Sequence, residues 1–502
     1  MKKLVSLLLA LLLMFGCAYA AEYAPAITDE PVTLTCMRYI RDIDNIDMSD
    51  LWFNNHLEEL TGVHIEYTAV SQSDFPQQLN LMYASGEYPD LVIDCNNNVD
   101  LEMYGVEQGV YIPLDDIIDD YMPNYKALME TGELYYAATK ASDGHIYCTG
   151  YIADSNDHTS AGYLFINKVW LEELGLDMPT SMDELYEVLL AFKEAHPDGY
   201  IWEDIFSDLY TYYPQLWGFT DSGNWMSITE EGVVRFNGTL QNFRDMLEFI
   251  SKCYEAGILD PDCLTQDQNT KISKLNQNNI GMAYLWRLRS MGWDCLVDTM
   301  TRLDCFPADG YDVVIKMNLP IANKQVFITK SCEDVETAAK WIDYQFSPQM
   351  VFEGFYGPED GLWSWNEDGK CQLGAAGDQE CVKWAYGVNT VCFMPGPVYN
   401  TYFQQPDYRI ERINYAAEVE QYYETYTMQY VLNIATPTGD EVQEVAKLKA
   451  QIDSLMKESI ADFIRNGITD ETWDAFQEEL LGAGIERYVE IYQGVFDNYM
   501  GL

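Results

Sequence analysis

The sequence predicts an α/β protein with at least two domains, and three observations support this. Short apolar runs alternate along the chain with segments whose apolar residues recur at helical spacing, which is typical of layered sheets and helices. The chain has 502 residues, more than one hydrophobic core comfortably holds. Hydrophobic residues make up 48% of the chain and aromatic residues 14%, which indicates a well-packed globular protein.

The first hundred residues predict the start of a doubly wound sheet. Strands are expected at 32–36, 63–69 and 91–93. Helices are expected between them at 52–61 and 75–84. Ligands of such sheets bind beyond the carboxyl ends of the strands, where Asp94, Asn96 and Asn97 follow the third strand.

Residues 163–199 predict a second α/β unit. A strand at 163–166 precedes a short helix at 169–174, which Gly175 is expected to stop. Ser181 and Glu184 form a capping box for the next helix. The apolar face of that helix comprises Met182, Leu185, Leu189 and Phe192. We interpret this segment, including Trp170, as structural core.

The rest of the chain continues the alternation. Strands are expected at 284–286 and 326–329, and an amphipathic helix is expected from Val335 to Phe346. From about Thr438 the chain is expected to be helical, with one apolar stripe made of Trp473, Phe476 and Leu480.

Residues 1–20 have the charged start, apolar centre and small-residue exit of a secretory signal. Gly16 and Cys17 after the apolar run also resemble a lipoprotein cleavage site, so a lipid anchor on Cys17 and simple secretion both stay open. No later stretch has the roughly 18 apolar residues that a membrane span needs.

Charge and cysteine content restrict the partners. The net charge is −52, and removing the two lysines of residues 1–20 leaves 27 − 81 = −54, which argues against nucleic acid and anionic membranes as partners. Eleven of the twelve cysteines follow the signal, without any CxxC pair. We expect mostly free, buried thiols, with one or two disulfides open among Cys371, Cys381 and Cys392.

The sequence contains no catalytic signature. The five histidines form no HxxxH or HExxH pair, and no GxSxG turn occurs. With 81 acidic residues, a pair of carboxylates has little diagnostic value for a glycosidase. An extracellular glycoside hydrolase or polysaccharide lyase remains the alternative to a binding protein, and a surface adhesin is a third.

Several segments resemble the bacterial extracellular solute-binding proteins of the carbohydrate type, in their long Gram-positive branch. They include "ASGEYPDLVI", "GVYIPLDDIIDDYMPN", "DGHIYCTGY", and above all "FINKVWLEELGLDMPTSMDELYEVLLAFKEAHPDG". "FITKSCEDVETAAKWIDYQFSPQ" and "DFIRNGITDETWDAFQEELLGAGIERYVEIYQ" resemble later parts of the family. Their order and spacing cover nearly the whole mature chain.

The resemblance implies a periplasmic-binding-protein-like fold, in which two lobes joined by crossovers close on a sugar. It places the first lobe at 22–155 plus 288–325, and the second at 156–287 plus 326–502 with a helical C-terminal part. It implies a monomeric receptor that binds an oligosaccharide and delivers it to the permease subunits of an ATP-driven importer, without a cofactor.

Many relatives carry an acidic, calcium-like loop after the capped helix. The corresponding segment here, residues 196–205, keeps Asp198 and Asp204, but His196, Tyr200 and Ile205 replace the other oxygen ligands. Calcium prefers six to eight oxygen ligands. The sequence therefore predicts weak calcium binding or none.

Sugar rings stack on aromatic side chains, and their hydroxyls need planar polar partners. Residues next to strand ends and crossovers are therefore the candidates for ligand binding. They are Arg38, Tyr39, Asp94, Asn96, Asn97, Asp154, Asn156, Trp286, Arg287, Trp363 and Trp365.

Overall fold

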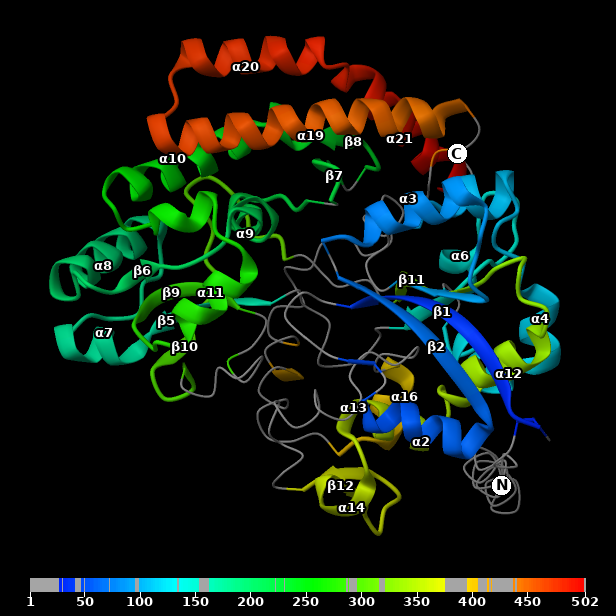
Figure 1. Ribbon diagram of the computed structural model, residues 1–502. Helices are drawn as coiled ribbons and strands as arrows, with labels where there is room; N and C mark the ends of the chain where they lie inside the picture. The colour runs from blue at the N-terminus through cyan, green and yellow to red at the C-terminus, as the bar shows by residue number, and fades with distance from the viewer. Residues whose placement is uncertain are drawn as a thin grey trace, which may run out of the picture.

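The computed structural model contains two α/β lobes, each built on its own sheet, with long C-terminal helices beside the second lobe (Figure 1). The described residues run from 27 to 500 with several gaps. The gaps are 41–46, 95–98, 153–161, 289–295, 316–320, 375–394 and 405–412, most of 415–439, and a few further positions that include 286 and 287.

The first lobe has a five-stranded sheet in the order β2-β1-β3-β11-β4. Its strands are β1 (Val32–Ile40), β2 (Val63–Ser71), β3 (Leu91–Ile93), β4 (Thr149–Ile152) and β11 (Ile321–Ile328). Strands β2, β1 and β3 are parallel, whereas β11 runs antiparallel to both β3 and β4. Residues on its two faces belong to different core clusters, so both faces are buried.

Helices cover both faces of this sheet. They are α2 (Trp52–Thr61), α3 (Phe75–Ser85), α4 (Asp115–Tyr121), α5 (Pro123–Met129), α6 (Tyr135–Thr139), α12 (Val335–Tyr344), α13 (Pro348–Tyr356) and α16 (Gly396–Tyr402). Helix α2 has the predicted bounds. It ends where Gly62 adopts φ 75°, a left-handed conformation that glycine adopts without steric cost.

The second lobe has a four-stranded sheet in the order β10-β5-β9-β6. Its strands are β5 (Tyr163–Asn167), β6 (Tyr200–Trp202), β9 (Ile280–Leu285) and β10 (Met300–Arg302). Its helices are α7 (Lys168–Leu174), α8 (Met182–Ala195), α9 (Phe206–Thr211), α10 (Gln241–Glu255) and α11 (Gln268–Leu275). A small antiparallel hairpin of this lobe joins β7 (Met226–Ile228) to β8 (Val234–Phe236). A second hairpin, which packs in the core of the first lobe, joins β12 (Trp363–Trp365) to β13 (Cys371–Leu373).

The segment around α7 and α8 is structural, as predicted. Ser181 Oγ accepts a hydrogen bond from the Glu184 amide at 3.2 Å. The Glu184 carboxylate reaches back to the amide and hydroxyl of Thr180, one residue earlier than a standard capping box. Trp170 is buried and stacks on His196 with ring centroids 3.9 Å apart.

The C-terminal part is helical, as predicted, and packs against the second lobe. It comprises α19 (Asp440–Asn466), α20 (Asp470–Gly482) and α21 (Ile485–Met500). The predicted stripe is buried in the core cluster that also holds α8 and α10. Trp225 Nε1 donates to Asp453 at 2.7 Å, which ties α19 to the body of the lobe.

The predicted assignment of the later segments to the lobes is wrong. Strand β10 pairs with β5 of the second sheet, so residues 300–302 do not belong to the first lobe. Strand β11 pairs with β3 and β4, and Trp341 and Phe346 lie in the first lobe's core. A short apolar run can pair with many strand edges, and here long-range packing selected the edge.

Seven cysteines lie in the described part of the chain, and no two of them form a disulfide with each other. Six of them are buried, as predicted, while Cys305 is partly exposed. The thiol of Cys371 is free, which contradicts a disulfide at this position, and Cys381 and Cys392 lie outside the described residues. Among the described helices, none has both the length and the apolar content to cross a bilayer.

Candidate functional site

The carboxyl edge of the first sheet brings three predicted ligand residues together. Arg38 lies opposite Ile93 in the parallel register of β1 and β3. Tyr39 and Asp94 are the next residues on the two strands, so all three share one edge of the sheet. Arg38, Tyr39 and Asp94 therefore lie at one edge of the sheet, and their role in ligand binding stays a prediction.

Arg38 is a buried cation whose hydrogen bonding is incomplete among the described residues. Its side chain is only 2% exposed, and neither Nε nor Nη2 has a hydrogen-bond partner there. Tyr67 on β2 lies beside it. Burial raises the pKa of Tyr67, and the Arg38 guanidinium opposes this. A buried guanidinium with unused N–H groups can donate to a planar or hydroxyl acceptor.

Tyr39 and Asp94 have structural contacts at this edge. The Tyr39 ring meets the Phe75 ring edge-on at 5.7 Å and lies in the core cluster beneath α3. Asp94 is fully buried, and its carboxylate accepts from the Val99 amide at 2.8 Å. The Asp94 contact ties Val99 to the end of β3.

Several predicted ligand residues lie outside the described residues, and their placement stays a prediction. They are Asn96, Asn97, Asp154, Asn156, Trp286 and Arg287. Cys17 and the rest of the signal also lie outside. Strand β9 ends at Leu285, directly before Trp286, and β4 ends at Ile152, two residues before Asp154.

The structure contradicts a ligand-capping role for Trp363. Its side chain is 2% exposed, and its indole N–H donates to the Gly357 carbonyl at 2.8 Å. The ring packs 5.8 Å from Phe352 in the core of the first lobe, although it was expected in the second. Trp365, also in this cluster rather than in the second lobe, is partly buried and donates to Gln349 at 2.9 Å. An apolar pair around a hairpin is a common core element.

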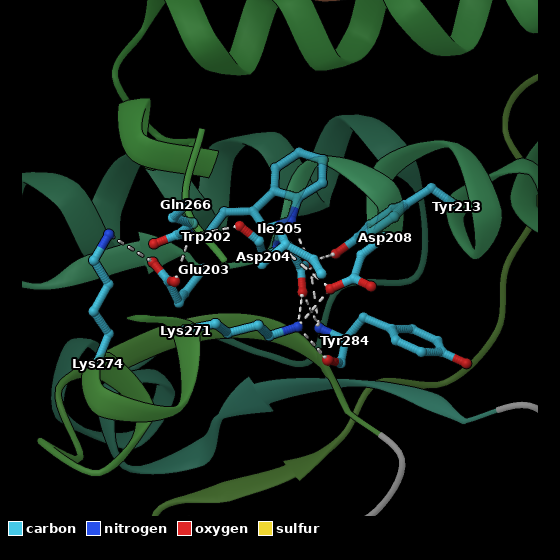
Figure 2. Close-up of polar contacts among 10 residues, drawn as sticks. All are labelled: Trp202, Glu203, Asp204, Ile205, Asp208, Tyr213, Gln266, Lys271, Lys274 and Tyr284. Carbon is cyan, nitrogen blue, oxygen red and sulfur yellow. Dashed lines mark hydrogen bonds and ion pairs between the residues drawn. The ribbon is translucent and has the colours of Figure 1, made fainter. Parts of the chain in front are cut away.

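The carboxyl edge of the second sheet holds a buried ionic cluster (Figure 2). Lys271 on α11 donates to Asp204 Oδ1 and Asp208 Oδ2, each at 2.7 Å, and to the Tyr284 carbonyl at 3.0 Å. The Asp204 carboxylate also accepts from Trp202 Nε1, the Tyr213 hydroxyl and the Tyr284 amide. Asp204 and Lys271 thus hold both backbone polar groups of Tyr284.

The two neighbouring carboxylates keep the Lys271 ammonium group charged inside this cluster. Burial lowers the pKa of Lys271, but Asp204 and Asp208 together raise it above its ordinary value. Burial raises the pKa of Asp208, and Lys271 opposes that shift. A buried charge is tolerated only when it is paired and hydrogen-bonded, and Lys271 meets both conditions.

A second lysine of α11, Lys274, is also paired with carboxylates at this edge. Lys274 donates to Asp260 at 2.7 Å and to Asp262 at 3.1 Å, and lies 3.8 Å from Glu203. Burial, followed by the neighbouring Asp260, raises the pKa of Glu203 to about 9. Sequence analysis missed both lysines. Their spacing of three residues in a chain with 29 basic and 81 acidic residues was an available signal.

The calcium-like loop does not gather its two acidic side chains. Asp198 is exposed, whereas Asp204 points inward to Lys271. His196 stacks on Trp170, and the Tyr200 ring lies 5.0 Å from the Lys274 ammonium group. In the described part of the chain, no cluster of three His, Cys, Asp or Glu side chains is arranged to hold a metal.

A cavity of about 820 Å³ lies along α2 and strand β2 of the first lobe. Its lining includes Glu58, His64, Glu66 and Trp341 but none of the predicted ligand residues. The acidic lining disfavours an anionic occupant.

The chain belongs to the bacterial extracellular solute-binding protein family, whose model matches residues 50–351. A curated relative is the fructooligosaccharide ABC transporter substrate-binding protein FusA of Streptococcus pneumoniae. It is 27% identical over 94% of this chain and 91% of its own length.

Solved structures show the same architecture. FusA of S. pneumoniae, as an EF-hand mutant in complex with fructo-nystose, has a TM-score of 0.79 and 26% identity, over 93% of this chain and 99% of its own. The alginate-binding protein AlgQ2 without calcium ion has a TM-score of 0.78 at 22% identity, over 94% and 99% of the two chains. At 22% identity, the likeness to AlgQ2 shows a shared fold and nothing more.

The family membership confirms the prediction of a non-enzymatic binding protein of the ABC-transporter type. It favours neither a glycoside hydrolase, a polysaccharide lyase nor an adhesin. Export of the chain is likewise consistent with an extracellular family.

Proposed function

We propose that the mature chain is a monomeric receptor that binds a neutral oligosaccharide between its two lobes and delivers it to the permease of an ATP-driven importer. Fructooligosaccharides are the first ligands to test. The observation that carries this proposal is the relationship to FusA, which extends over 94% of the chain.

Charge favours a neutral sugar over a uronate. The mature chain carries 27 − 81 = −54 charges, so a polyanionic ligand would approach against a repulsive field. Arg38 supplies one buried cation at the edge of the first sheet, whereas Lys271 and Lys274 are already engaged by carboxylates. Fructans carry no charge and need only hydroxyl partners and an apolar face.

The ligand site is proposed at the facing carboxyl edges of the two sheets. Arg38 and Asp94 contribute from the first sheet, with Asn96 and Asn97 in the following loop. Trp286 and Arg287 come directly after β9 of the second sheet, and Asp154 and Asn156 lie in the crossover after β4. The Trp286 ring would stack on a sugar face, and the other groups would bind hydroxyls.

Calorimetric titration with kestose and nystose tests the ligand class, with galacturonate and alginate oligomers as the acidic comparison. We expect one site per chain for the neutral sugars, and chromatography of the incubated sugar should show no cleavage product. Accumulating products without stoichiometric binding would contradict a receptor role.

Two tryptophan variants test the location of the site. Trp286→Ala should weaken binding by more than about 1 kcal/mol, because an aromatic anchor in a desolvated pocket contributes disproportionately. Trp170→Ala should instead lower the free energy of unfolding by about 3–5 kcal/mol, because Trp170 is buried against Phe192 and His196. The reverse result would place the site elsewhere.

We also propose that Cys17 is lipidated and anchors the receptor to the outer face of the cytoplasmic membrane. A solute receptor outside a single-membrane cell benefits from tethering near its permease. Cys17→Ala should move the protein from the membrane fraction to the medium. An unchanged distribution, with a mature N-terminus at Ala21 or Glu22, would show ordinary signal cleavage.

A further inference from the structure

We propose that the Lys271 ammonium group holds Asp204, Asp208 and Tyr284 together as a bound cation could, so that the second lobe folds and stays folded without calcium. This inference concerns the calcium-like segment 196–205 and its surroundings, and does not depend on which sugar is bound. It rests on where the side chains of this segment point.

Oxygen atoms from three separate elements converge on Lys271, as they would around a bound cation. Two carboxylate oxygens and one backbone carbonyl, from three separate elements, lie within 3.0 Å of its Nζ. Asp204 follows β6, Asp208 lies on α9 and Tyr284 lies on β9. A protonated amine has three donors, and all three are used here. Figure 2 shows Asp204, Asp208 and Tyr284 around the end of the Lys271 side chain.

The loop itself no longer fits calcium. At position 196 an imidazole, stacked on Trp170, replaces a carboxylate, and at position 205 the isoleucine side chain supplies no oxygen. Asp198 is exposed and contributes its backbone carbonyl to Asn279 at 3.0 Å. With Asp204 turned inward, the loop cannot supply the six to eight oxygen ligands that calcium requires.

The lysine also gives the edge a property that an exchangeable metal lacks. Lys271 is covalently part of α11, so its attraction for Asp204 and Asp208 does not vary with the concentration of free cations. Lys274 adds a similar link from the same helix to Asp260. The end of β9 is therefore held by cations that belong to the chain itself, at the carboxyl edge of the second sheet.

The first test uses the unmodified mature protein. Its melting temperature is measured in chelator, in millimolar CaCl₂, and in MgCl₂ at the same ionic strength. The magnesium sample controls for general screening of the acidic surface. We expect calcium and magnesium to differ by less than about 2 °C. A calcium-specific rise of about 5 °C or more, with saturable calcium binding by calorimetry, would overturn the proposal.

The second test removes the ammonium group. Lys271→Met keeps most of the side-chain volume, and should lower the melting temperature by about 10 °C, because it leaves two carboxylates unpaired in the interior. Lys126→Met is the matched control, since Lys126 pairs with Asp119 at the surface. The control should change the melting temperature by less than about 2 °C.

A double-mutant cycle separates charge from packing. In an Asp208→Asn background, Lys271→Met should cost clearly less than in the native background, because one of the two unpaired carboxylates is gone. An equal cost in both backgrounds, or no cost in either, would contradict an electrostatic role. If Lys271→Met alone does not fold, the comparison of chelator and calcium on the unmodified protein still decides.

Discussion

The carboxyl edges of the two sheets use buried cations in opposite ways. At the edge of the first sheet, Arg38 is 2% exposed, yet two of its guanidinium nitrogens lack a partner among the described residues. At the edge of the second sheet, Lys271 is equally buried, but each of its three donors has an oxygen acceptor. Burial alone therefore does not distinguish a structural charge from one available to a ligand.

The difference shows how one fold can separate stability from binding. A fully satisfied ionic cluster fixes the backbone around it, because removing any member leaves an unpaired charge. A cation with unused donors costs stability in the unliganded protein and recovers it when a ligand supplies acceptors. We therefore expect mutations at the second edge to affect folding, and mutations at the first edge to affect binding.

The largest effect is expected from Asp204→Ala. It removes the acceptor of Lys271, Trp202, Tyr213 and the Tyr284 amide, and should lower the free energy of unfolding by about 3–5 kcal/mol. Asp198→Ala is the control, because it removes the other carboxylate of the loop at an exposed position. It should change the free energy of unfolding by less than about 0.5 kcal/mol. Denaturant unfolding measures both, and similar losses would imply a shared metal site.

Arg38→Met should have its main effect on sugar affinity. Loss of hydrogen bonds from a charged donor should weaken binding by about 1.5–3 kcal/mol. Stability should stay the same or rise, because the variant buries no unsatisfied guanidinium. Calorimetric titration and thermal unfolding on the same samples check this pair of outcomes. A strongly destabilised variant with native affinity would make Arg38 structural, like Lys271.

Glu203→Gln should stabilise the protein increasingly as the pH rises from 5 to 8. The pKa of Glu203 is about 9 in the folded chain, above its ordinary value of 4.5. Between these values the unfolded chain has lost this proton while the folded chain retains it, so stability falls as the pH rises. Glutamine removes that loss, which amounts to at most about 1.4 kcal/mol for each pH unit in this range. The exposed Glu194→Gln should show no such trend.

The smallest effect is expected from Ser181→Ala at the start of α8. The loss of the bond from the Glu184 amide should cost about 1 kcal/mol of stability. Sugar affinity should not change, because this cap lies within a structural segment. A loss of affinity at unchanged stability, measured by titration and unfolding, would contradict that interpretation.

Local patterns accounted for most of the elements. The helix at 52–61, the strand at 91–93 and the start of α8 were predicted correctly because capping residues, glycines and apolar spacing act within a few residues of each other. Strand β1 extends four residues beyond its predicted end, since strand length depends on the partners β2 and β3. The apolar run of β11 was also recognised, although not its partner strands.

The amino-acid sequence by itself determined the α/β class, the family and the gathering of Arg38, Tyr39 and Asp94 at one edge, because parallel strands end together. Only the tertiary structure decided that β11 joins the first sheet, that Trp363 is core, and that Lys271 meets Asp204, 67 residues away in the chain. The physical reason is that sheet pairing and buried ion pairs depend on atoms brought together from distant segments. No local pattern encodes which distant acceptor a lysine will find.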